Sequence, residues 1–274
     1  MEEPLASDVQ QSPGQDSRTV IEARGLTKRY EDGTLALDAL ELSVRAGEIY
    51  CLLGANGAGK TTALNLFLGF VPATAGRCLV MGEDTLGDPR ARRHMAYLSE
   101  SVELYGNFSA RWNLGFFARL AGRNNLRRGD YDRALREVSL PERSFERKVR
   151  TFSKGMRQKL GLAITMIKDA PALFLDEPLS GLDPRAAQEV ATALLELRDR
   201  GKAILTSTHD VFRMRDLADR VGILKEGRKV IELRREQLVD EDLEKLYFDY
   251  VGGMLPFHLS PLACAAELPT RRMT

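Results

Sequence analysis

Residues 54–61 read Gly-Ala-Asn-Gly-Ala-Gly-Lys-Thr and match the pattern G-x-x-x-x-G-K-[ST], which is typical of a loop that cradles phosphates. Glycines let successive backbone N–H groups turn toward phosphate oxygens, and the following helix N-terminus adds positive partial charge. Lys60 is placed to reach the β- and γ-phosphates, and the Thr61 hydroxyl to ligate Mg²⁺. We therefore expect the nucleotide-binding residues to include Gly54, Ala55, Asn56, Gly57, Ala58, Gly59, Lys60, Thr61 and Thr62.

A second group of chemically active side chains follows another apolar run, where residues 172–177 read Ala-Leu-Phe-Leu-Asp-Glu. Two adjacent carboxylates at the end of a strand point to opposite sides of the chain. Asp176 is placed to hold Mg²⁺, directly or through water, and Glu177 to polarise an attacking water. Together with the phosphate loop upstream, the pair predicts hydrolysis of a nucleoside triphosphate.

These loops need a scaffold, and the surrounding sequence predicts one in which short strands alternate with helices. Strand-like apolar runs occur at residues 19–26, 40–45, 49–53, 77–82, 94–99, 171–176, 202–208, 220–227 and 228–233. Helical patterns occur at residues 59–70, 184–201 and 211–220. Such alternation is typical of an α/β domain with a mainly parallel sheet.

Between about residues 101 and 168 the strand signals vanish and only helical patterns remain, at 109–122, 130–140 and 153–167. Ser109 is a plausible N-cap for the first of these helices. The sequence therefore predicts a helical subdomain inserted into the α/β domain.

Polar and irregular segments suggest the domain limits. We expect a disordered tail at 1–18, an ATPase domain at 19–237 and a C-terminal helix and tail at 238–274.

The overall composition excludes several classes of protein. The 40 Lys and Arg residues against 39 Asp and Glu give a net charge of +1, unlike a strongly basic nucleic-acid binder. A hydrophobic fraction of 43% excludes disorder along the whole chain. Three scattered cysteines indicate neither a disulfide framework nor a zinc site, and no transmembrane run or secretory signal is readable. We therefore expect a reduced, cytoplasmic protein.

Four further motifs surround the two sites. Residues 152–156 read Phe-Ser-Lys-Gly-Met, residues 180–183 read Ser-Gly-Leu-Asp, His209 follows a strand-like run, and Tyr30 lies upstream of the phosphate loop. In this order, over about residues 19–235, the chain resembles the ATP-binding subunit of ABC transporters. The resemblance implies a P-loop ATPase core with a mainly parallel sheet, an N-terminal antiparallel β part and the inserted helical subdomain.

The resemblance also implies roles for individual residues. Tyr30 looks like the aromatic residue that stacks on adenine, and Asp183 like a residue that communicates across a dimer. Residues 152–156 look like the signature loop, which meets the γ-phosphate of ATP held by a partner subunit. Four of its residues are expected to contribute to nucleotide binding: Ser153, Lys154, Gly155 and Met156.

His209 looks like the switch histidine that contacts the γ-phosphate, and Glu100 stands where the family usually has a glutamine. The expected catalytic residues are thus Glu177, His209 and Lys60, and the expected metal ligands are Thr61, Asp176 and Glu100.

Two departures from the usual family pattern indicate which branch of the family the chain resembles. The usual signature is Leu-Ser-Gly-Gly-Gln, whereas this chain has Phe-Ser-Lys-Gly-Met at residues 152–156, and Glu100 replaces the usual glutamine. Both variants look like the branch that serves two-component exporters of drugs, lipids, polysaccharides or copper-related cargo.

The function implied is a magnesium-dependent ATPase subunit on the cytoplasmic face of a membrane. It would dimerise around two ATP molecules, with an identical copy or a paralogue, and power a separate polytopic permease; no nucleic-acid partner is expected. One alternative is an ABC-type ATPase without a transport role that acts on nucleic acid or the ribosome. Another is a regulatory nucleotide-binding module without turnover, which the presence of Lys60, Asp176, Glu177 and His209 disfavours.

Overall fold

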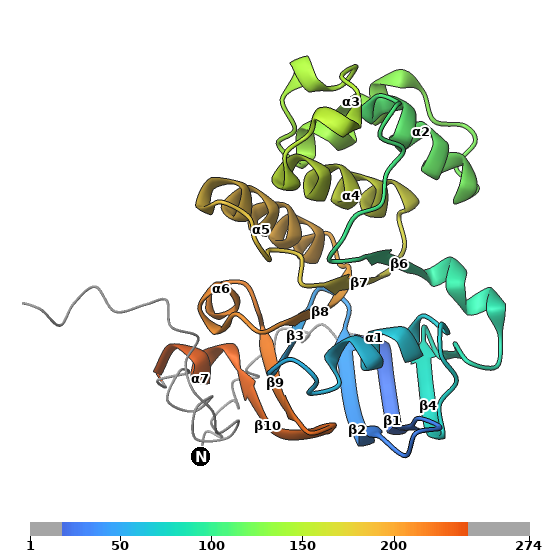
Figure 1. Ribbon diagram of the computed structural model, residues 1–274, viewed down its shortest axis with the longest axis vertical. Helices are drawn as coiled ribbons and strands as arrows, with labels where there is room; N and C mark the ends of the chain where they lie inside the picture. Colours follow the sequence, from blue (N-terminus) through green and yellow to red (C-terminus); the bar gives the residue numbers. More distant parts are fainter. Residues whose placement is uncertain (1–17, 241–274) are drawn as a thin grey trace, which may run out of the picture.

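The computed structural model describes residues 18–240 of the 274-residue chain (Figure 1). A four-stranded antiparallel sheet has the order β2-β1-β4-β5, and a six-stranded sheet has the order β10-β9-β3-β8-β7-β6. The first sheet consists of β1 (Thr19–Arg29), β2 (Leu35–Arg45), β4 (Ala75–Val80) and β5 (Glu83–Asp84). The second consists of β3 (Ile49–Leu53), β6 (Met95–Leu98), β7 (Ala172–Asp176), β8 (Ala203–Thr208), β9 (Arg220–Lys225) and β10 (Arg228–Arg234).

The helices complete the α/β architecture. The α-helices are α1 (Lys60–Phe67), α2 (Ala110–Leu120), α3 (Arg128–Glu137), α4 (Lys154–Lys168), α5 (Pro184–Asp199), α6 (Val211–Arg215) and α7 (Arg235–Asp240). Three 3-10 helices lie at η1 (Pro89–His94), η2 (Glu142–Ser144) and η3 (Val149–Thr151). Figure 1 shows α2, α3 and α4 at one end of the molecule and the antiparallel sheet at the other. The predicted fold class, including the N-terminal antiparallel part and the inserted helices, is confirmed.

The central strands of the six-stranded sheet are buried on both faces, which explains the continuous apolar runs in the sequence. All residues of β3, β7 and β8 are buried. Side chains alternate along β3: Ile49 and Cys51 join the core shared with the helical subdomain, whereas Tyr50 and Leu52 join the core beneath the antiparallel sheet. One sheet thus separates two hydrophobic cores.

Strand order brings the chemically active loops together. β8 lies between β3 and β7 and pairs parallel with both of them. The carboxyl ends of parallel strands meet at one edge of a sheet. The phosphate loop after β3, the carboxylates after β7 and His209 after β8 therefore meet, although more than a hundred residues separate the first from the second.

The inserted subdomain forms as the sequence predicts. Ser109 caps α2 by accepting the Trp112 N–H at 3.1 Å, and Ser153 caps α4 by accepting the Met156 N–H at 3.2 Å. The Asn113 side chain exchanges hydrogen bonds with both backbone groups of Tyr105, which ties α2 to the segment after β6.

The two largest departures from the expected element limits are five residues each, at the start of β2 and at the end of α6. β2 begins at Leu35, five residues before the expected start, because it pairs with β1 from Leu35 opposite Arg29 onward. α6 ends at Arg215 rather than near residue 220. Asp219 exchanges backbone and side-chain hydrogen bonds with Ile49, at 2.9 Å each, so this residue is drawn to the sheet and cannot continue a helix.

The expected domain limits are only partly within the described residues. α7 begins at Arg235, just before the expected boundary at 238. The expected tails fall almost entirely on residues 1–17 and 241–274, which lie outside the described residues. The proposed division of the chain stays a prediction.

An ionic cluster ties three strands of the six-stranded sheet together at the end opposite the carboxyl ends of β3 and β8. The Glu232 carboxylate of β10 accepts hydrogen bonds from the Tyr50 hydroxyl at 2.8 Å and from Arg220 and Lys229 at 2.5 Å. Burial alone would raise the pKa of Glu232, but the bonds from Arg220, Lys229 and Tyr50 lower it to about 2. The ionised carboxylate is therefore a stabilising partner in the folded state.

We expect Glu232→Gln to reduce the free energy of unfolding near neutral pH by about 1–2 kcal/mol. The full pKa depression is discounted because the side chain is 29% exposed to solvent. Since the folded pKa of about 2 lies below the ordinary 4.5, this stabilisation exists above pH 4.5 and is lost as the pH falls toward 2. Urea unfolding at pH 7 and pH 3 measures the difference. The control is Glu142→Gln, at a surface pair with Arg136, and equal effects of the two variants at pH 7 would contradict the assignment.

Candidate functional site

The phosphate loop lies between β3 and α1 and requires glycine at defined positions. Gly59 has a φ of +106°, and a Cβ built there would lie 2.4 Å from the Ala36 carbonyl oxygen. A Cβ at Gly54 would lie 2.6 Å from the Leu224 carbonyl oxygen. These close backbone approaches leave no room for a side chain at either position. Glycine at both positions therefore allows the tight loop before α1 to form.

Lys60, the first residue of α1, points back into this loop. Its ammonium group donates to the carbonyl oxygens of Gly54 at 2.7 Å and Ala55 at 3.1 Å. The residue is only 6% exposed. Burial lowers the pKa of Lys60, and the carboxylates of Glu177 and Asp176 act in the opposite direction. A buried cation thus faces two buried carboxylates across the site.

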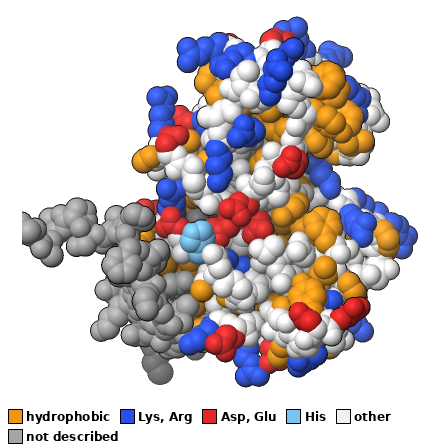
Figure 2. All heavy atoms as spheres, in the orientation of Figure 1, with side chains coloured by type: hydrophobic (Ala, Val, Ile, Leu, Met, Phe, Trp, Pro, Cys, Tyr) orange, Lys and Arg blue, Asp and Glu red, His pale blue; other side chains and the backbone are white. Residues whose placement is uncertain are grey.

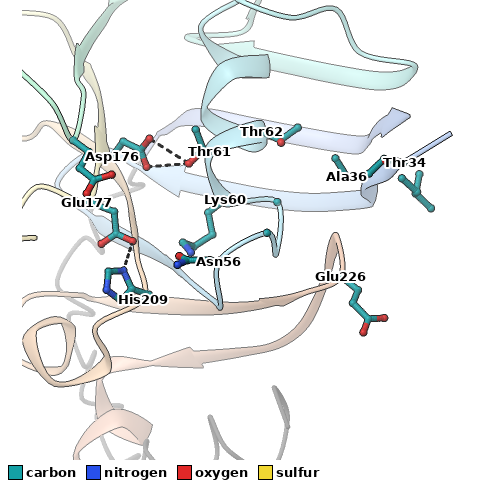
Figure 3. Close-up of a pocket in the computed structure, with 14 residues that line it drawn as sticks. Thr34, Ala36, Asn56, Lys60, Thr61, Thr62, Asp176, Glu177, His209 and Glu226 are labelled. Carbon is teal, nitrogen blue, oxygen red and sulfur yellow. Dashed lines mark hydrogen bonds and ion pairs between the residues drawn. The ribbon is translucent and has the colours of Figure 1, made fainter. Parts of the chain in front are cut away.

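Asp176 ends β7 opposite the start of α1. Its two carboxylate oxygens lie 3.4 and 3.3 Å from the Thr61 hydroxyl (Figure 3), and the Ser207 hydroxyl also donates to it. Hydroxyl and carboxylate oxygens are the hard ligands that Mg²⁺ prefers, and Mg²⁺ takes the rest of its shell from water and phosphates. Within residues 18–240, no cluster of three His, Cys, Asp or Glu side chains could hold a metal by itself. The donor set fits a metal shared with a nucleotide.

Glu177 follows Asp176 with a φ of +49°, so its side chain turns back toward the cavity. One carboxylate oxygen accepts the Thr208 hydroxyl at 2.9 Å, and the other lies 2.7 Å from Nδ1 of His209 (Figure 3). Its backbone N–H donates to the Ser207 carbonyl at 3.1 Å. β8 therefore positions both the backbone and the carboxylate of Glu177.

These groups surround a cavity of about 500 Å³, a volume ordinary for a ligand site. Its lining residues are Thr34, Leu35, Ala36, Asn56, Gly57, Gly59, Lys60, Thr61, Thr62, Glu100, Asp176, Glu177, His209 and Glu226. The expected catalytic residues and the expected metal ligands all line this one cavity.

Glu100 reaches the cavity from the segment after β6. It is exposed, and the Ser180 hydroxyl lies 3.5 Å from its carboxylate. Ser180 belongs to the 180–183 motif, so Glu100 lies between the cavity and that motif. Its role as a metal ligand stays a prediction.

Tyr30 does not line the cavity. It follows β1 and begins a turn in which the Gly33 N–H donates to its carbonyl at 3.0 Å. The ring is 37% exposed, and the Lys28 ammonium lies 5.0 Å from its centroid. The turn leads directly to Thr34, Leu35 and Ala36, which do line the cavity. Adenine stacking by Tyr30 stays a prediction.

The signature loop does not line this cavity either. Ser153 and Lys154 are exposed at the start of α4, and a Cβ at Gly155 would lie 2.9 Å from Cβ of Ala186 in α5. Asp183 caps α5 by accepting the Ala186 N–H at 3.0 Å. The signature loop and the phosphate loop thus lie on separate parts of one chain.

Several residues of the site could not be found by motif. Thr34, Leu35, Ala36 and Glu226 line the cavity but carry no spacing signal. Ser207 and Thr208, which bond Asp176 and Glu177, had a weak signal. Three hydroxyl residues end an otherwise apolar strand at 206–208, just where a parallel strand meets the site.

Comparisons with known proteins agree with this geometry. The family described as ABC transporter matches residues 37–180. An uncharacterised ABC transporter ATP-binding protein of Bacillus subtilis is 35% identical over 228 residues, which cover 82% of this chain and 73% of that protein. The Nod factor export ATP-binding protein I of Ralstonia nicotianae is 34% identical over 256 residues, covering 93% and 79% respectively.

A solved structure of an ATP-binding subunit of an ABC transporter has the same fold. It superposes with a TM-score of 0.73 at 30% identity, and the match covers 84% of this chain and 99% of that one. The phosphate loop, the paired carboxylates and the histidine meet in one cavity on this fold. The chain therefore belongs to the ABC transporter family, as one of its ATP-binding and ATP-hydrolysing subunits.

Proposed function

We propose that this chain dimerises around two ATP molecules on the cytoplasmic face of a membrane and powers a separate permease that exports its cargo. One observation carries the dimer: the cavity unites the phosphate loop, both carboxylates and His209, whereas residues 152–156 of the signature loop do not line it. Exposed N–H groups and a serine hydroxyl at a helix start suit a phosphate that is held by another subunit. A second subunit would complete each site.

The site residues divide the chemistry of ATP hydrolysis among them. Lys60 would bind the β- and γ-phosphates, and Glu177 would accept a proton from the attacking water. His209, bonded to Glu177, would orient that carboxylate and contact the γ-phosphate. Thr61, Asp176 and Glu100 are the residues that would hold Mg²⁺, which when bound neutralises phosphate charge. Catalysis would then rest on positioning and charge stabilisation.

An aromatic cluster on the helical subdomain supports a protein partner. The cluster comprises Tyr105, Phe108, Trp112, Phe116 and Phe117, and Trp112 stacks on Phe108 at 3.9 Å and on Phe116 at 5.2 Å between ring centroids. Tyr105 is 46% and Phe108 43% exposed. Figure 2 shows hydrophobic side chains gathered at this end of the molecule. Exposed aromatic surface of this kind is typical of protein interfaces.

The membrane partner and the direction of transport rest on further observations. No helix among residues 18–240 is long and apolar enough to cross a membrane. The Ralstonia relative is named for Nod factor export, and the Phe-Ser-Lys-Gly-Met signature and Glu100 favour the same direction.

The test is a membrane pull-down in mild detergent with ATP, using tagged Glu177→Gln protein to hold the ATP-bound state. A stoichiometric polytopic membrane protein, identified by mass spectrometry, is the expected result. Recovery only of ribosomes, nucleic acid or soluble proteins would overturn the transport function in favour of a non-transport ATPase.

Adding Trp112→Ala to this bait should reduce recovery of the permease at least tenfold, since a buried aromatic anchor contributes about 2 kcal/mol or more to an interface. The matched control is Phe212→Ala, which removes a 51% exposed ring on α6. Equal recovery with both variants would exclude the aromatic cluster as the docking surface.

A further inference from the structure

Arg213 on α6 makes contacts that join two functional loops. One guanidinium nitrogen donates to the Leu179 carbonyl at 2.6 Å and another to the Leu182 carbonyl at 3.4 Å. Its Nε pairs with the Asp210 carboxylate at 3.1 Å, and that carboxylate also accepts the Arg213 backbone N–H at 3.2 Å. Arg213 thus links the loop after β8 to the two carbonyls that flank Ser180 and Gly181.

Hydrogen bonds of Thr208 and Asp210 connect this contact to the hydrolytic centre. The Thr208 hydroxyl donates to the Glu177 carboxylate at 2.9 Å and accepts the Asp210 N–H at 3.1 Å. Asp210 then holds Arg213. Thr208, Asp210 and Arg213 thus connect the carboxylate that is expected to activate water to the carbonyls of residues 179 and 182.

The contacted segment, residues 179–183, is held as one unit by its own packing and capping contacts. The side chains of Leu179 and Leu182 are buried, Gly181 has a φ of +65°, and Asp183 caps α5. A planar guanidinium can reach two carbonyls and a carboxylate at once, which the single ammonium of lysine cannot do in the same geometry. Movement of the 209–210 loop would therefore move the 179–183 segment with it.

We propose that Arg213 is a positioning residue that couples the His209 loop to the 179–183 segment of the same subunit, and through Asp183 to the site of the partner subunit. This inference rests on the proposed dimer. Arg213 is not among the residues that line the nucleotide cavity, so its effect is indirect: it would report the state of one ATP site to the other.

Mixed dimers with one active site test this coupling. One differently tagged subunit carries Glu177→Gln, so only the site formed around its partner's phosphate loop can turn over. Arg213→Met is then placed in the inactive subunit, whose 179–183 segment would adjoin the active site in the proposed dimer. We expect kcat to fall about tenfold with the KM for ATP nearly unchanged, the size expected for loss of charge-assisted hydrogen bonds that position a catalytic group.

Two controls separate coupling from misfolding. Arg133→Met replaces an exposed arginine on α3 that lies 4.0 Å from Asp130, and it should leave kcat unchanged. Arg213→Lys keeps the positive charge but lacks the several N–H groups of the guanidinium. It should lower kcat as Arg213→Met does, while the unfolding temperature stays near that of the parent. If Arg213→Met fails to fold or dimerise, Arg213→Lys alone decides the test.

An unchanged kcat with Arg213→Lys or Arg213→Met in the inactive subunit would overturn the coupling. A parent dimer that neither assembles nor hydrolyses ATP would instead refute the proposed function, so the two failures are distinguishable.

Discussion

Replacing Glu177 by glutamine should lower ATP hydrolysis by about three orders of magnitude while ATP still binds, since removal of a general base typically costs 10²–10⁴-fold. Glutamine keeps the shape of the side chain and can still accept the Thr208 hydroxyl, which bonds Glu177 at 2.9 Å. It cannot take a proton from water. The bond from His209 to this carboxylate, 2.7 Å in the structure, would be weakened because the acceptor loses its charge.

The same variant should accumulate as an ATP-bound dimer, because the γ-phosphate that bridges the two halves is no longer removed. Steady-state phosphate release measures the first effect, and light scattering after size-exclusion chromatography with ATP measures the second. The control is Glu142→Gln, which changes an exposed carboxylate on η2. Hydrolysis by Glu177→Gln at the parent rate would show that another group is the general base.

Lys60→Ala should weaken ATP binding about a hundredfold. Two charge-assisted hydrogen bonds from a buried ammonium contribute about 3 kcal/mol, and every 1.4 kcal/mol is a factor of ten in affinity. Lys60 is well placed for this because its ammonium already lies within the loop, bonded to the carbonyls of Gly54 and Ala55. When a phosphate enters the loop, the Lys60 ammonium would exchange these neutral carbonyl oxygens for charged phosphate oxygens.

Isothermal titration calorimetry with ATP gives the dissociation constant of each variant. The matched control is Lys148→Ala, an exposed lysine at the start of η3. Circular dichroism checks that the variant folds, which we expect because truncation removes the desolvation cost of a buried cation. If the variant binds ATP with an affinity within about twofold of the parent, Lys60 does not contribute to phosphate binding.

The phosphate loop, the helix caps and the buried strands could be predicted because each depends on residues that are contiguous in the sequence. Gly54 and Gly59 are required because a Cβ would lie 2.6 and 2.4 Å from backbone carbonyl oxygens, and Gly57 has a φ of +81°, so the glycine motif itself predicts the shape of the loop. Ser109 and Ser153 cap their helices through a side chain and an N–H three residues apart. Strands such as β3 and β7 could be predicted because burial on both faces favours unbroken apolar runs.

Prediction failed where a contact between residues far apart in the sequence decided where an element ends. The helix expected to run to residue 220 ends at Arg215, because Ile49 at the start of β3 forms hydrogen bonds with Asp219. No local pattern reveals a hydrogen bond between residues 170 positions apart.

The sequence by itself determined the elements, the phosphate loop, the carboxylate pair and the family. Only the tertiary structure decided how they work together. The placing of β8 between β3 and β7 brings Thr208 to Glu177, and the close approach of the Ala36 carbonyl to Gly59 brings the start of β2 to the cavity. It also places Arg213 against the carbonyls of Leu179 and Leu182. Such contacts depend on which strands are neighbours and on where backbone carbonyls point. Both are set by packing of the whole domain, because residue spacing encodes only contacts within a few positions along the chain.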